Sequence, residues 1–268
     1  MKQKKKPLLH LLMLHYGSKY TKDQLTAFVA CKNVYANGEL SVDPRQLIGE
    51  DSVLSLSFEQ YVSRGGYKLE HALDTFSLSV TDLVMLDAGS STGGFTDCLL
   101  QRGAALVHSV DVGYNQLDWR LRTDERVQVL EKQNIMTLEE LSPPPQAAVC
   151  DLSFRTIGDA ASHILSLSGN TWLVALIKPQ FEVPKDLEDF TGVITDKALL
   201  VEVMQTVHTF LSEEGVGIHA LTMSPLTGHK GNREFLALLK KSEGLDRLSF
   251  TGRLEALLAL PQSAGLYP

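Results

Sequence analysis

The stretch Leu83-Val-Met-Leu-Asp87-Ala-Gly89-Ser-Ser-Thr-Gly93-Gly94-Phe95 decides the fold of this chain. Its apolar beginning predicts a buried strand, which ends in an acid and leads through a glycine-rich turn into a helix from about Phe95. Glycines allow positive φ angles and a close approach of the backbone to a ligand, and a helix start presents free N–H groups. A strand, turn and helix of this kind open the nucleotide site of a doubly wound α/β domain.

The spacing of the glycines distinguishes between possible ligands. A dinucleotide site reads G-x-G-x-x-G and binds a pyrophosphate at the helix N-terminus, whereas this turn reads D-x-G-x-x-x-G-G-F with a carboxylate at the strand tip. A carboxylate suits a cationic ligand better than a pyrophosphate, and S-adenosylmethionine carries a sulfonium and an amino group. Taken alone, the stretch could also be an ordinary strand-turn-helix connection that binds nothing.

The chain after Leu83 alternates between strand-like and helix-like segments, which predicts a mainly parallel sheet. We expect strands at 83–87, 106–111, 127–130, 146–151, 172–177, 215–222 and 233–239. Helices are expected between them, at 95–102, 116–122, 137–140, 156–166 and 196–212. The fold class is therefore α/β.

Polar residues follow four of these strands at their carboxyl ends, where open α/β sheets bind ligands. Asp87 ends the first strand, and Asp111 ends the second at the distance where a carboxylate takes ribose hydroxyls. Asn134 follows the third strand and Asp151 ends the fourth. Any one of them could simply mark a strand end, but together they predict a cofactor cleft.

The fifth predicted strand is apolar, and Lys178 directly follows its last residue. A lysine at the mouth of such a strand must find a carboxylate or lose its proton, so we expect an ion pair with Asp151 from the neighbouring strand. By itself, this pair could be purely structural.

The first sixty residues predict a small α+β module with a basic charge. Helices are expected at 8–16 and 21–31 and strands at 34–36, 40–42 and 53–56, with Asn37-Gly38 typical of a type I′ hairpin. Before Glu39 the chain carries seven lysines and one acid, a balance of +6, which leaves −13 for the remainder of a chain with net charge −7. A basic module joined to an acidic one indicates nucleic-acid binding, although the lysines could also serve solubility alone.

The composition is that of an ordinary soluble globular protein. Of the 268 residues, 44% are apolar and 21% charged, no apolar run reaches the roughly 18 residues of a membrane span, and we expect no signal peptide. Cys31, Cys98 and Cys150 are expected to be buried thiols in a reducing cytoplasm. No CxxC or HExxH spacing occurs, so no metal site is expected.

Six short motifs carry a specific family resemblance. They are Tyr-Val-Ser-Arg-Gly-Gly at 61–66, Asp-Ala-Gly-Ser-Ser-Thr-Gly-Gly-Phe at 87–95, Asp-Val-Gly-Tyr at 111–114, Asp-Leu-Ser-Phe at 151–154, Lys-Pro-Gln-Phe-Glu at 178–182 and Gly-Asn-Arg-Glu at 231–234. With them, residues 61–240 resemble the hemolysin A (TlyA) family of FtsJ-like ribose 2′-O-methyltransferases. The resemblance implies a Rossmann-like class I methyltransferase fold, with a seven-stranded mixed sheet whose last strand is antiparallel.

The same resemblance implies the residues of the site. The Lys-Asp-Lys-Glu catalytic tetrad of FtsJ-like enzymes matches Lys68, Asp151, Lys178 and Glu234. The cofactor is S-adenosylmethionine, held around its amino acid portion by the glycine turn, at its ribose by Asp111 and near its adenine by Asn134, with Asp87 acting through water or the turn backbone. The full set of expected cofactor-binding residues is Asp87, Gly89, Ser90, Gly93, Gly94, Phe95, Asp111, Asn134 and Asp151.

The chemistry of methyl transfer to a hydroxyl agrees with this assignment. A ribose 2′-hydroxyl is a poor nucleophile whereas a sulfonium is already a good leaving group, so the enzyme must chiefly orient and deprotonate the hydroxyl. Lys178 would accept or orient that proton, while Asp151 and Glu234 position the two ammonium groups. Burial and the like charge of Lys68 favour a neutral Lys178 and the two acids favour its ammonium form, so the balance stays open.

The N-terminal module resembles the αL RNA-binding motif found in a small-subunit ribosomal protein, in pseudouridine synthases and in some tyrosyl-tRNA synthetases. RNA contacts are expected at Lys5, Lys6, Lys19, Lys22 and Lys32, and at Arg64, which we expect to couple RNA docking to cofactor binding. The implied substrate is a cytidine ribose in small- or large-subunit ribosomal RNA, in the cytoplasm.

The expected organisation is an RNA-binding domain over 1–58, a linker over 59–67, a methyltransferase domain over 68–245 and a tail over 246–268. Two other functions stay open at this point. The family's name points to a membrane-active hemolysin, which the absence of spans and of an export signal argues against, so no stable membrane insertion is expected. A non-catalytic RNA-binding ribosome assembly factor is argued against by the presence of all four tetrad residues. The oligomeric state is not predicted.

Overall fold

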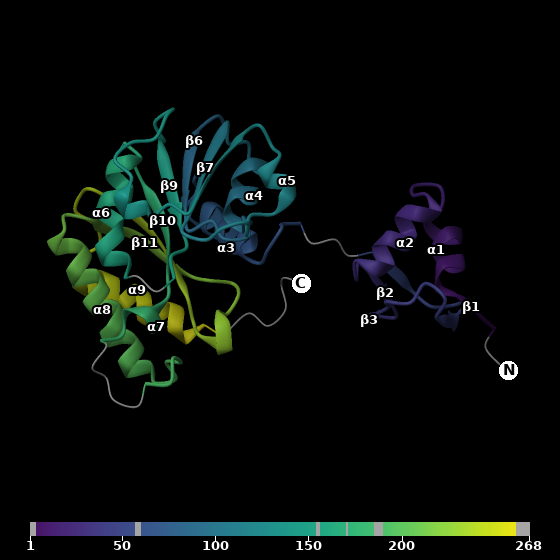
Figure 1. Cartoon of the computed structure of the whole chain (residues 1–268). Helices are drawn as coiled ribbons and strands as arrows, with labels where there is room; N and C mark the ends of the chain where they lie inside the picture. The colour runs from purple at the N-terminus through teal and green to yellow at the C-terminus, as the bar shows by residue number, and fades with distance from the viewer. Residues whose placement is uncertain (1–3, 57–59, 154–155, 170, 185–189, 261–268) are drawn as a thin grey trace. The chain divides into compact units, whose positions relative to one another are not determined.

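The computed structural model describes residues 4–56, 60–153, 156–169, 171–184 and 190–260 (Figure 1). By their internal contacts, residues 1–60 and residues 61–268 form two compact units. Each unit has its own hydrophobic core.

The first unit packs two helices against short antiparallel strands. Its elements are β1 (Lys5–Pro7), α1 (Leu8–Tyr16), α2 (Lys22–Ala30), β2 (Val34–Ala36), β3 (Glu39–Leu40), β4 (Leu47–Gly49) and β5 (Leu54–Leu56). The predicted hairpin is confirmed, because Asn37 and Gly38 have φ angles of 53° and 82° between the paired strands β2 and β3. Thr21 begins α2 with a capping box, and both helices bury leucines in one small core.

The second unit is built on a seven-stranded sheet in the order β11-β12-β10-β9-β6-β7-β8. Its strands are β6 (Val84–Ala88), β7 (Leu106–Asp111), β8 (Val127–Glu131), β9 (Ala147–Cys150), β10 (Leu173–Ile177), β11 (Gly217–Met223) and β12 (Phe235–Lys240). Only β12 is antiparallel to both of its neighbours, while β10, β9, β6, β7 and β8 pair in parallel. The predicted α/β class and the antiparallel last strand are confirmed.

Helices cover both faces of this sheet (Figure 1). One core cluster joins the sheet to α6 (Ile157–Leu167), α8 (Lys197–Glu213) and α9 (Arg247–Ala259). The other joins it to α3 (Gly65–Thr75), α4 (Gly94–Gln101) and α5 (Trp119–Arg122). Apolar side chains on both faces explain why the central strands are almost continuously apolar in the sequence.

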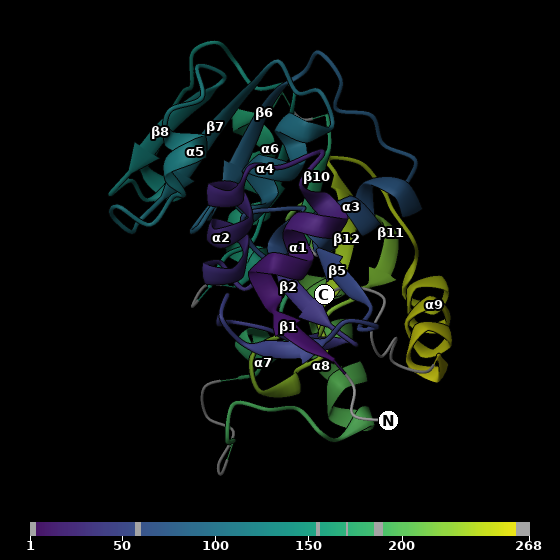
Figure 2. The ribbon, with the colours of Figure 1, turned by 90° about the vertical axis from the view of Figure 1, so that its right-hand side faces the viewer.

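Several segments differ from the sequence prediction. Residues assigned to a linker begin α3, and residues assigned to a tail form α9, which lies beside β11 at the opposite edge of the sheet from β8 (Figure 2). α9 buries Phe250 and Leu254 in the core, so this segment belongs to the second unit. The helix expected at 137–140 is a 3-10 turn at Ile135–Thr137, and the strand expected at 40–42 ends at Leu40.

Two single residues also depart from expectation. Cys31, expected to be buried, is exposed because it caps the end of α2, whereas Cys98 and Cys150 are buried as predicted. Trp119 departs from the burial that is usual for tryptophan, because it is 71% exposed at the start of α5.

The described residues contain no group of three or more His, Cys, Asp or Glu side chains arranged to hold a metal ion. Within the same ranges, no helix is long and apolar enough to cross a membrane. The buried His108 and His208 each place Nε2 at a backbone carbonyl, 2.8 and 2.7 Å away, while Nδ1 of each ring is buried without a hydrogen-bond partner.

Candidate active site

The glycine-rich turn joins β6 to α4, and two of its glycines have left-handed backbone. The φ angles are +84° at Gly89 and +96° at Gly93. A Cβ on Gly89 would lie 2.6 Å from the carbonyl oxygen of Asp151, and a Cβ on Gly93 would collide with the side chain of Leu121. The turn therefore requires glycine at both positions, as the sequence predicts, and it starts α4 at the carboxyl edge of the sheet.

A cleft of about 420 Å³ opens at this edge of the sheet. Its volume is within the range of about 300–1,000 Å³ that is common for small-molecule sites. Four of the predicted cofactor residues line it, namely Gly89, Asp111, Asn134 and Asp151. The other predicted residues are buried at the end of β6, in the turn and at the start of α4, and they do not line the cleft: Asp87, Ser90, Gly93, Gly94 and Phe95.

Asp111 and Asn134 are fixed to the cleft wall by backbone hydrogen bonds. The Asp111 carboxylate accepts from the N–H of Ser91 at 2.8 Å and from the N–H of Gly113 at 2.6 Å. The Asn134 side chain accepts from the N–H of Met136 at 3.1 Å and so caps the 3-10 turn. Both polar side chains are therefore pre-positioned before any ligand enters.

Asp87 lies fully buried under the turn. Its Oδ2 accepts a hydrogen bond of 2.6 Å from the hydroxyl of Thr96, and its Oδ1 is buried without a hydrogen-bond partner. Burial raises the pKa of Asp87 to about 7, against the lowering effect of the Thr96 hydrogen bond. The carboxyl group is thus close to the point where it gains or loses its proton at neutral pH.

We predict that replacing Asp87 with asparagine changes the pH dependence of stability. Because the folded-state pKa lies above that of the unfolded chain, Asp87 stabilises the fold at low pH and loses that contribution as pH rises from about 4 to about 7. An asparagine does not titrate, so Asp87→Asn should gain stability relative to the parent across this window, by on the order of 4 kcal/mol at most. Urea unfolding at a series of pH values without ligand measures the difference, and two parallel pH curves would contradict it.

The four tetrad residues form two ion pairs. Lys68 Nζ lies 2.6 Å from Glu234 Oε2, and these two side chains are only 11% and 3% exposed. Lys178 Nζ lies 2.5 Å from Asp151 Oδ1, with exposures of 13% and 27%. The predicted pairing of Lys178 with Asp151 is confirmed, and each lysine has its own carboxylate.

Strand register brings the two pairs to one end of the sheet. In the antiparallel pairing of β10 and β12, Ile177 lies opposite Phe235, so Lys178 and Glu234 are the next residues in the same register. Asp151 follows β9, which pairs with β10 on its other side, and α3, which carries Lys68, contacts β12. Asp151 also lines the cleft, which places the tetrad directly beside it.

The segment 61–66 packs on the start of α4. The N–H of Val62 donates to the carboxylate of Asp97 at 2.8 Å. A Cβ on Gly94 would collide with the hydroxyl oxygen of Ser63, so glycine is required for this close approach. The beginning of the second unit is therefore in direct contact with the helix that follows the glycine-rich turn.

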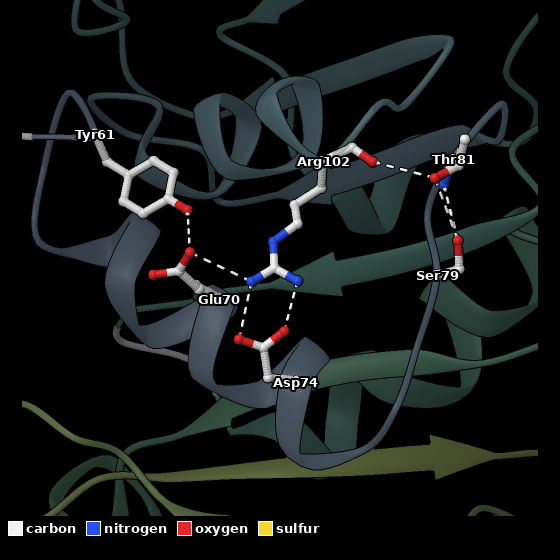
Figure 3. Close-up of polar contacts among 6 residues, drawn as sticks. All are labelled: Tyr61, Glu70, Asp74, Ser79, Thr81 and Arg102. Carbon is white, nitrogen blue, oxygen red and sulfur yellow. Dashed lines mark hydrogen bonds and ion pairs between the residues drawn. The ribbon is translucent and has the colours of Figure 1, made fainter.

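A polar cluster further fixes this segment to α3 and α4 (Figure 3). Arg102 donates to both carboxylate oxygens of Asp74, at 2.6 and 2.9 Å, and more weakly to Glu70 at 3.3 Å. The hydroxyl of Tyr61 donates to the same Glu70 oxygen at 2.9 Å. The Arg102 hydrogen bonds hold the pKa of Asp74 below its usual value.

Arg64, a predicted RNA contact, reaches the loop beside the tetrad instead of standing free. Its guanidinium donates to the carbonyl of Thr227 at 2.9 Å. The next residue, Gly228, lies against Glu234, because a Cβ there would collide with Glu234 Oε1. Arg64 thus connects the segment before α3 to the loop that covers one tetrad carboxylate.

The predicted RNA-contacting lysines of the first unit differ in their surroundings. Lys5, Lys19, Lys22 and Lys32 are exposed. Lys6 is half-buried and forms an ion pair of 2.8 Å with Glu50. Four of the five cations are therefore open to a phosphate backbone, and Lys6 is already paired.

Sequence reasoning missed two residues of the site. Ser153 accepts a hydrogen bond of 3.1 Å from Lys178 Nζ, and Gly228 makes room for Glu234. Ser153 could have been found from its place two residues after Asp151 in the Asp-Leu-Ser-Phe motif, whereas nothing in the sequence marks Gly228. Phe154 of that motif lies outside the described residues.

Comparison with known proteins finds relatives that are named as rRNA methyltransferases or as hemolysins. The family model described as FtsJ-like methyltransferase matches residues 61–241. The chain is 39% identical over 240 residues to a candidate rRNA methyltransferase, YqxC, of Bacillus subtilis, covering 87% of this chain and 85% of the relative. It is 36% identical over 234 residues to the 16S/23S rRNA (cytidine-2′-O)-methyltransferase TlyA of Mycobacterium tuberculosis, covering 85% and 87%. The solved structure of a candidate hemolysin from Streptococcus thermophilus is similar with a TM-score of 0.69 at 36% identity, covering 95% of this chain and 96% of the other.

Proposed function

The chain belongs to the FtsJ-like methyltransferase family, and from this premise we propose that it methylates the ribose 2′-hydroxyl of a cytidine in ribosomal RNA, with S-adenosylmethionine as methyl donor. The observation that carries the proposal is the two ion pairs beside the cleft, Lys68 with Glu234 and Lys178 with Asp151. Two amines held by carboxylates suit the activation of a hydroxyl and have no role in hydride transfer. The TlyA relative is named for this cytidine chemistry, which supports the same acceptor here.

The residues around the cleft fit the proposed cofactor. The glycine cradle at Gly89 and Gly93 suits an amino acid portion that lies close to the backbone, and the buried Asp87 below it would act through water or the turn backbone. Ser90, Gly94 and Phe95 complete that part of the site, Asp111 would hold the ribose and Asn134 would lie near the adenine. When bound, S-adenosylmethionine supplies an activated methyl group on a sulfonium, so the protein needs no metal to make the leaving group.

The protein's own contribution is to orient and deprotonate the acceptor hydroxyl. We assign Lys178 to hold or accept the hydroxyl proton at Nζ, where Asp151 and Ser153 fix its position. Lys68, held by Glu234, supplies a second positive charge that favours a developing alkoxide. General base catalysis of this kind contributes about 10²- to 10⁴-fold, and holding the hydroxyl in line with the methyl group adds to it.

The basic first unit is assigned to RNA docking through Lys5, Lys6, Lys19, Lys22 and Lys32. A ribose inside a duplex is sterically blocked, so the target nucleotide must be extruded before it reaches the tetrad. Arg64 would couple docking to the site, because it contacts the loop over Glu234 while its neighbour Ser63 touches the cofactor turn. The substrate is then a folded RNA of the small or the large ribosomal subunit, in the cytoplasm.

Salt is expected to weaken RNA binding steeply. Each phosphate that a lysine neutralises contributes a slope of about −0.7 to −0.9 to the plot of log K against log salt concentration. Replacing the exposed Lys19 and Lys22 with glutamine should reduce that slope by about one to two units. Replacing Lys6, which is paired with Glu50, should reduce it less. Titration of labelled ribosomal RNA at several salt concentrations measures the slopes, and an unchanged slope for the double variant would remove these lysines from the interface.

Transfer of labelled methyl from S-adenosylmethionine tests the function. Isolated small subunits, isolated large subunits and intact ribosomes from a strain that lacks the protein are each incubated with purified protein and donor. Label is expected on the RNA of at least one subunit. RNA binding without transfer on any of them would instead support the non-catalytic assembly factor, and leakage of liposomes at submicromolar protein without transfer would support the hemolysin.

A further inference from the structure

Glu182 lies at the end of α7 (Pro179–Glu182), the short helix that directly follows Lys178. The N–H of Phe181 donates to the carbonyl of Lys178 at 2.8 Å, so the backbone of Lys178 forms part of the first turn. Lys178 Nζ also lies 5.8 Å from the centre of the Phe181 ring. A contact that holds α7 in place therefore also holds the backbone from which the Lys178 side chain extends.

The Glu182 carboxylate reaches across to the start of α6. Its Oε1 accepts a hydrogen bond of 2.8 Å from the N–H of Ile157, the first residue of that helix. The residue that precedes α6, Thr156, does not cap it, because its hydroxyl donates to Asp159 at 2.7 Å. Helix starts leave N–H groups without partners, and a carboxylate there is favoured by the helix dipole. Glu182 thus supplies from another element the cap that α6 lacks.

The place of the Glu182 carboxyl group is costly to its charged form because it is removed from water, and the hydrogen bond from Ile157 offsets part of that cost. Burial raises the pKa of Glu182 to about 7, although the hydrogen bond from Ile157 opposes the rise. Glu182 is the last residue of the Lys-Pro-Gln-Phe-Glu motif, which begins with Lys178. Among the described contacts, no cation pairs with the Glu182 carboxylate. Removing an unpaired carboxylate from water costs free energy unless the carboxylate accepts a hydrogen bond from a specific group.

The two segments joined by Glu182 each carry one partner of an ion pair. Asp151 and Ser153 follow β9 and lead to α6, and Lys178 follows the neighbouring strand β10 and leads to α7. The Lys178 amine connects the two segments, because Nζ lies 2.5 Å from Asp151 Oδ1 and 3.1 Å from the hydroxyl oxygen of Ser153. The hydrogen bond between Glu182 and Ile157 connects the same two segments a second time, about one helical turn after Lys178.

We propose that Glu182 is a positioning residue for Lys178: its hydrogen bond to the start of α6 holds α7 in place and so keeps the Lys178 amine between Asp151 and Ser153. The carboxylate does not touch the reacting atoms and acts only through the geometry of these two segments. The effect on methyl transfer rests on the proposed function, whereas the effect on the position of Lys178 does not.

The test that needs no activity is the chemical reactivity of individual lysines. Purified variants are treated with trace acetic anhydride, and acetylation of Lys178 relative to Lys68 is measured by peptide mass spectrometry. Glu182→Ala should raise the relative reactivity of Lys178 at least fivefold, because its amine leaves the shelter of Asp151. Glu182→Gln keeps an acceptor oxygen for Ile157 and should stay within twofold of the parent.

Thr156→Ala is the matched control for the start of α6. It removes the Thr156–Asp159 hydrogen bond in the first turn of α6 without touching α7, so it should leave Lys178 within twofold of the parent. Equal reactivity of Lys178 in Glu182→Ala and the parent overturns the proposal. An equal rise in Thr156→Ala overturns it too, because fraying of α6 would then explain the effect.

A kinetic arm separates positioning from general stability. If the parent transfers methyl, Glu182→Ala should lower kcat by about 10- to 100-fold with the KM for S-adenosylmethionine within twofold, and Glu182→Gln should restore kcat. A rise in KM with unchanged kcat overturns the proposed route through Lys178. If the parent transfers no methyl to any RNA, the proposed function fails, and the acetylation ratio still decides the role of Glu182.

Discussion

Replacing Lys178 with alanine is expected to lower the rate of methyl transfer by about 10²- to 10⁴-fold, the range that loss of a positioned proton acceptor produces. The affinity for S-adenosylmethionine should change little, because the cleft keeps the carboxylate of Asp151, which is 27% exposed and can be hydrated once its partner is gone. Single-turnover transfer to ribosomal subunits gives the rate, and calorimetric titration gives the affinity.

Lys178→Arg distinguishes the two roles that the amine could have. A guanidinium keeps the charge and can pair with Asp151, but it does not accept a proton at neutral pH. A rate as low as that of Lys178→Ala assigns proton acceptance to Lys178, and a rate near the parent's assigns orientation by charge. A parental rate in Lys178→Ala itself would remove the residue from the mechanism.

The second large effect is expected at the other ion pair. Glu234→Ala leaves the Lys68 ammonium, only 11% exposed, without its carboxylate. Removal of one partner of a buried pair typically costs about 3–5 kcal/mol, since the remaining charge is neither hydrated nor neutralised. Chemical denaturation should therefore show a large fall in the free energy of unfolding, and methyl transfer should fall with it.

A double-mutant cycle isolates this charge effect from the loss of packing. Lys68→Met removes the ammonium and keeps a side chain of similar length. Added to Glu234→Ala, it should recover part of the lost stability, so that the double variant is more stable than the sum of the single effects predicts. Strict additivity would show that the two side chains do not stabilise each other.

The sequence predicts the sheet well because its signals are local. The Asn37-Gly38 hairpin and the turn at Gly89 and Gly93 depend on residues that tolerate positive φ, and the structure has positive φ at all four. The seven strands after Leu83 are apolar runs bounded by polar ends, and each of them is found within about two residues of its expected position.

The missed elements lack such signals or depend on distant partners. α3 begins with Gly65 and Gly66, which indicate a turn, yet Gly66 is required because a side chain there would collide with the Tyr61 ring. α9 follows a break in the family resemblance, and its place in the core depends on β11 and α8, far away in the chain. The pairing of β1 with β4 rests on three residues from each strand, too few for a periodic pattern.

The same contrast holds for the site. The pairing of Lys178 with Asp151 follows from two neighbouring strand ends, so residue chemistry alone predicts it. Lys68 and Glu234 are 166 positions apart, and no local pattern joins them. Their membership of the site came only from the family resemblance. The contact of Glu182 with Ile157 joins a side chain to a backbone N–H, which leaves no trace in the sequence pattern.

The most direct test of the account is the identity of the methylated nucleoside. Ribosomal RNA from subunits incubated with protein and S-adenosylmethionine is digested to nucleosides and analysed by mass spectrometry, with Lys178→Ala and protein-free incubations alongside. A gain of 2′-O-methylcytidine is expected with the parent protein and none with Lys178→Ala. A gain of a base-methylated nucleoside, or 2′-O-methylcytidine formed at the parental rate by Lys178→Ala, would contradict it.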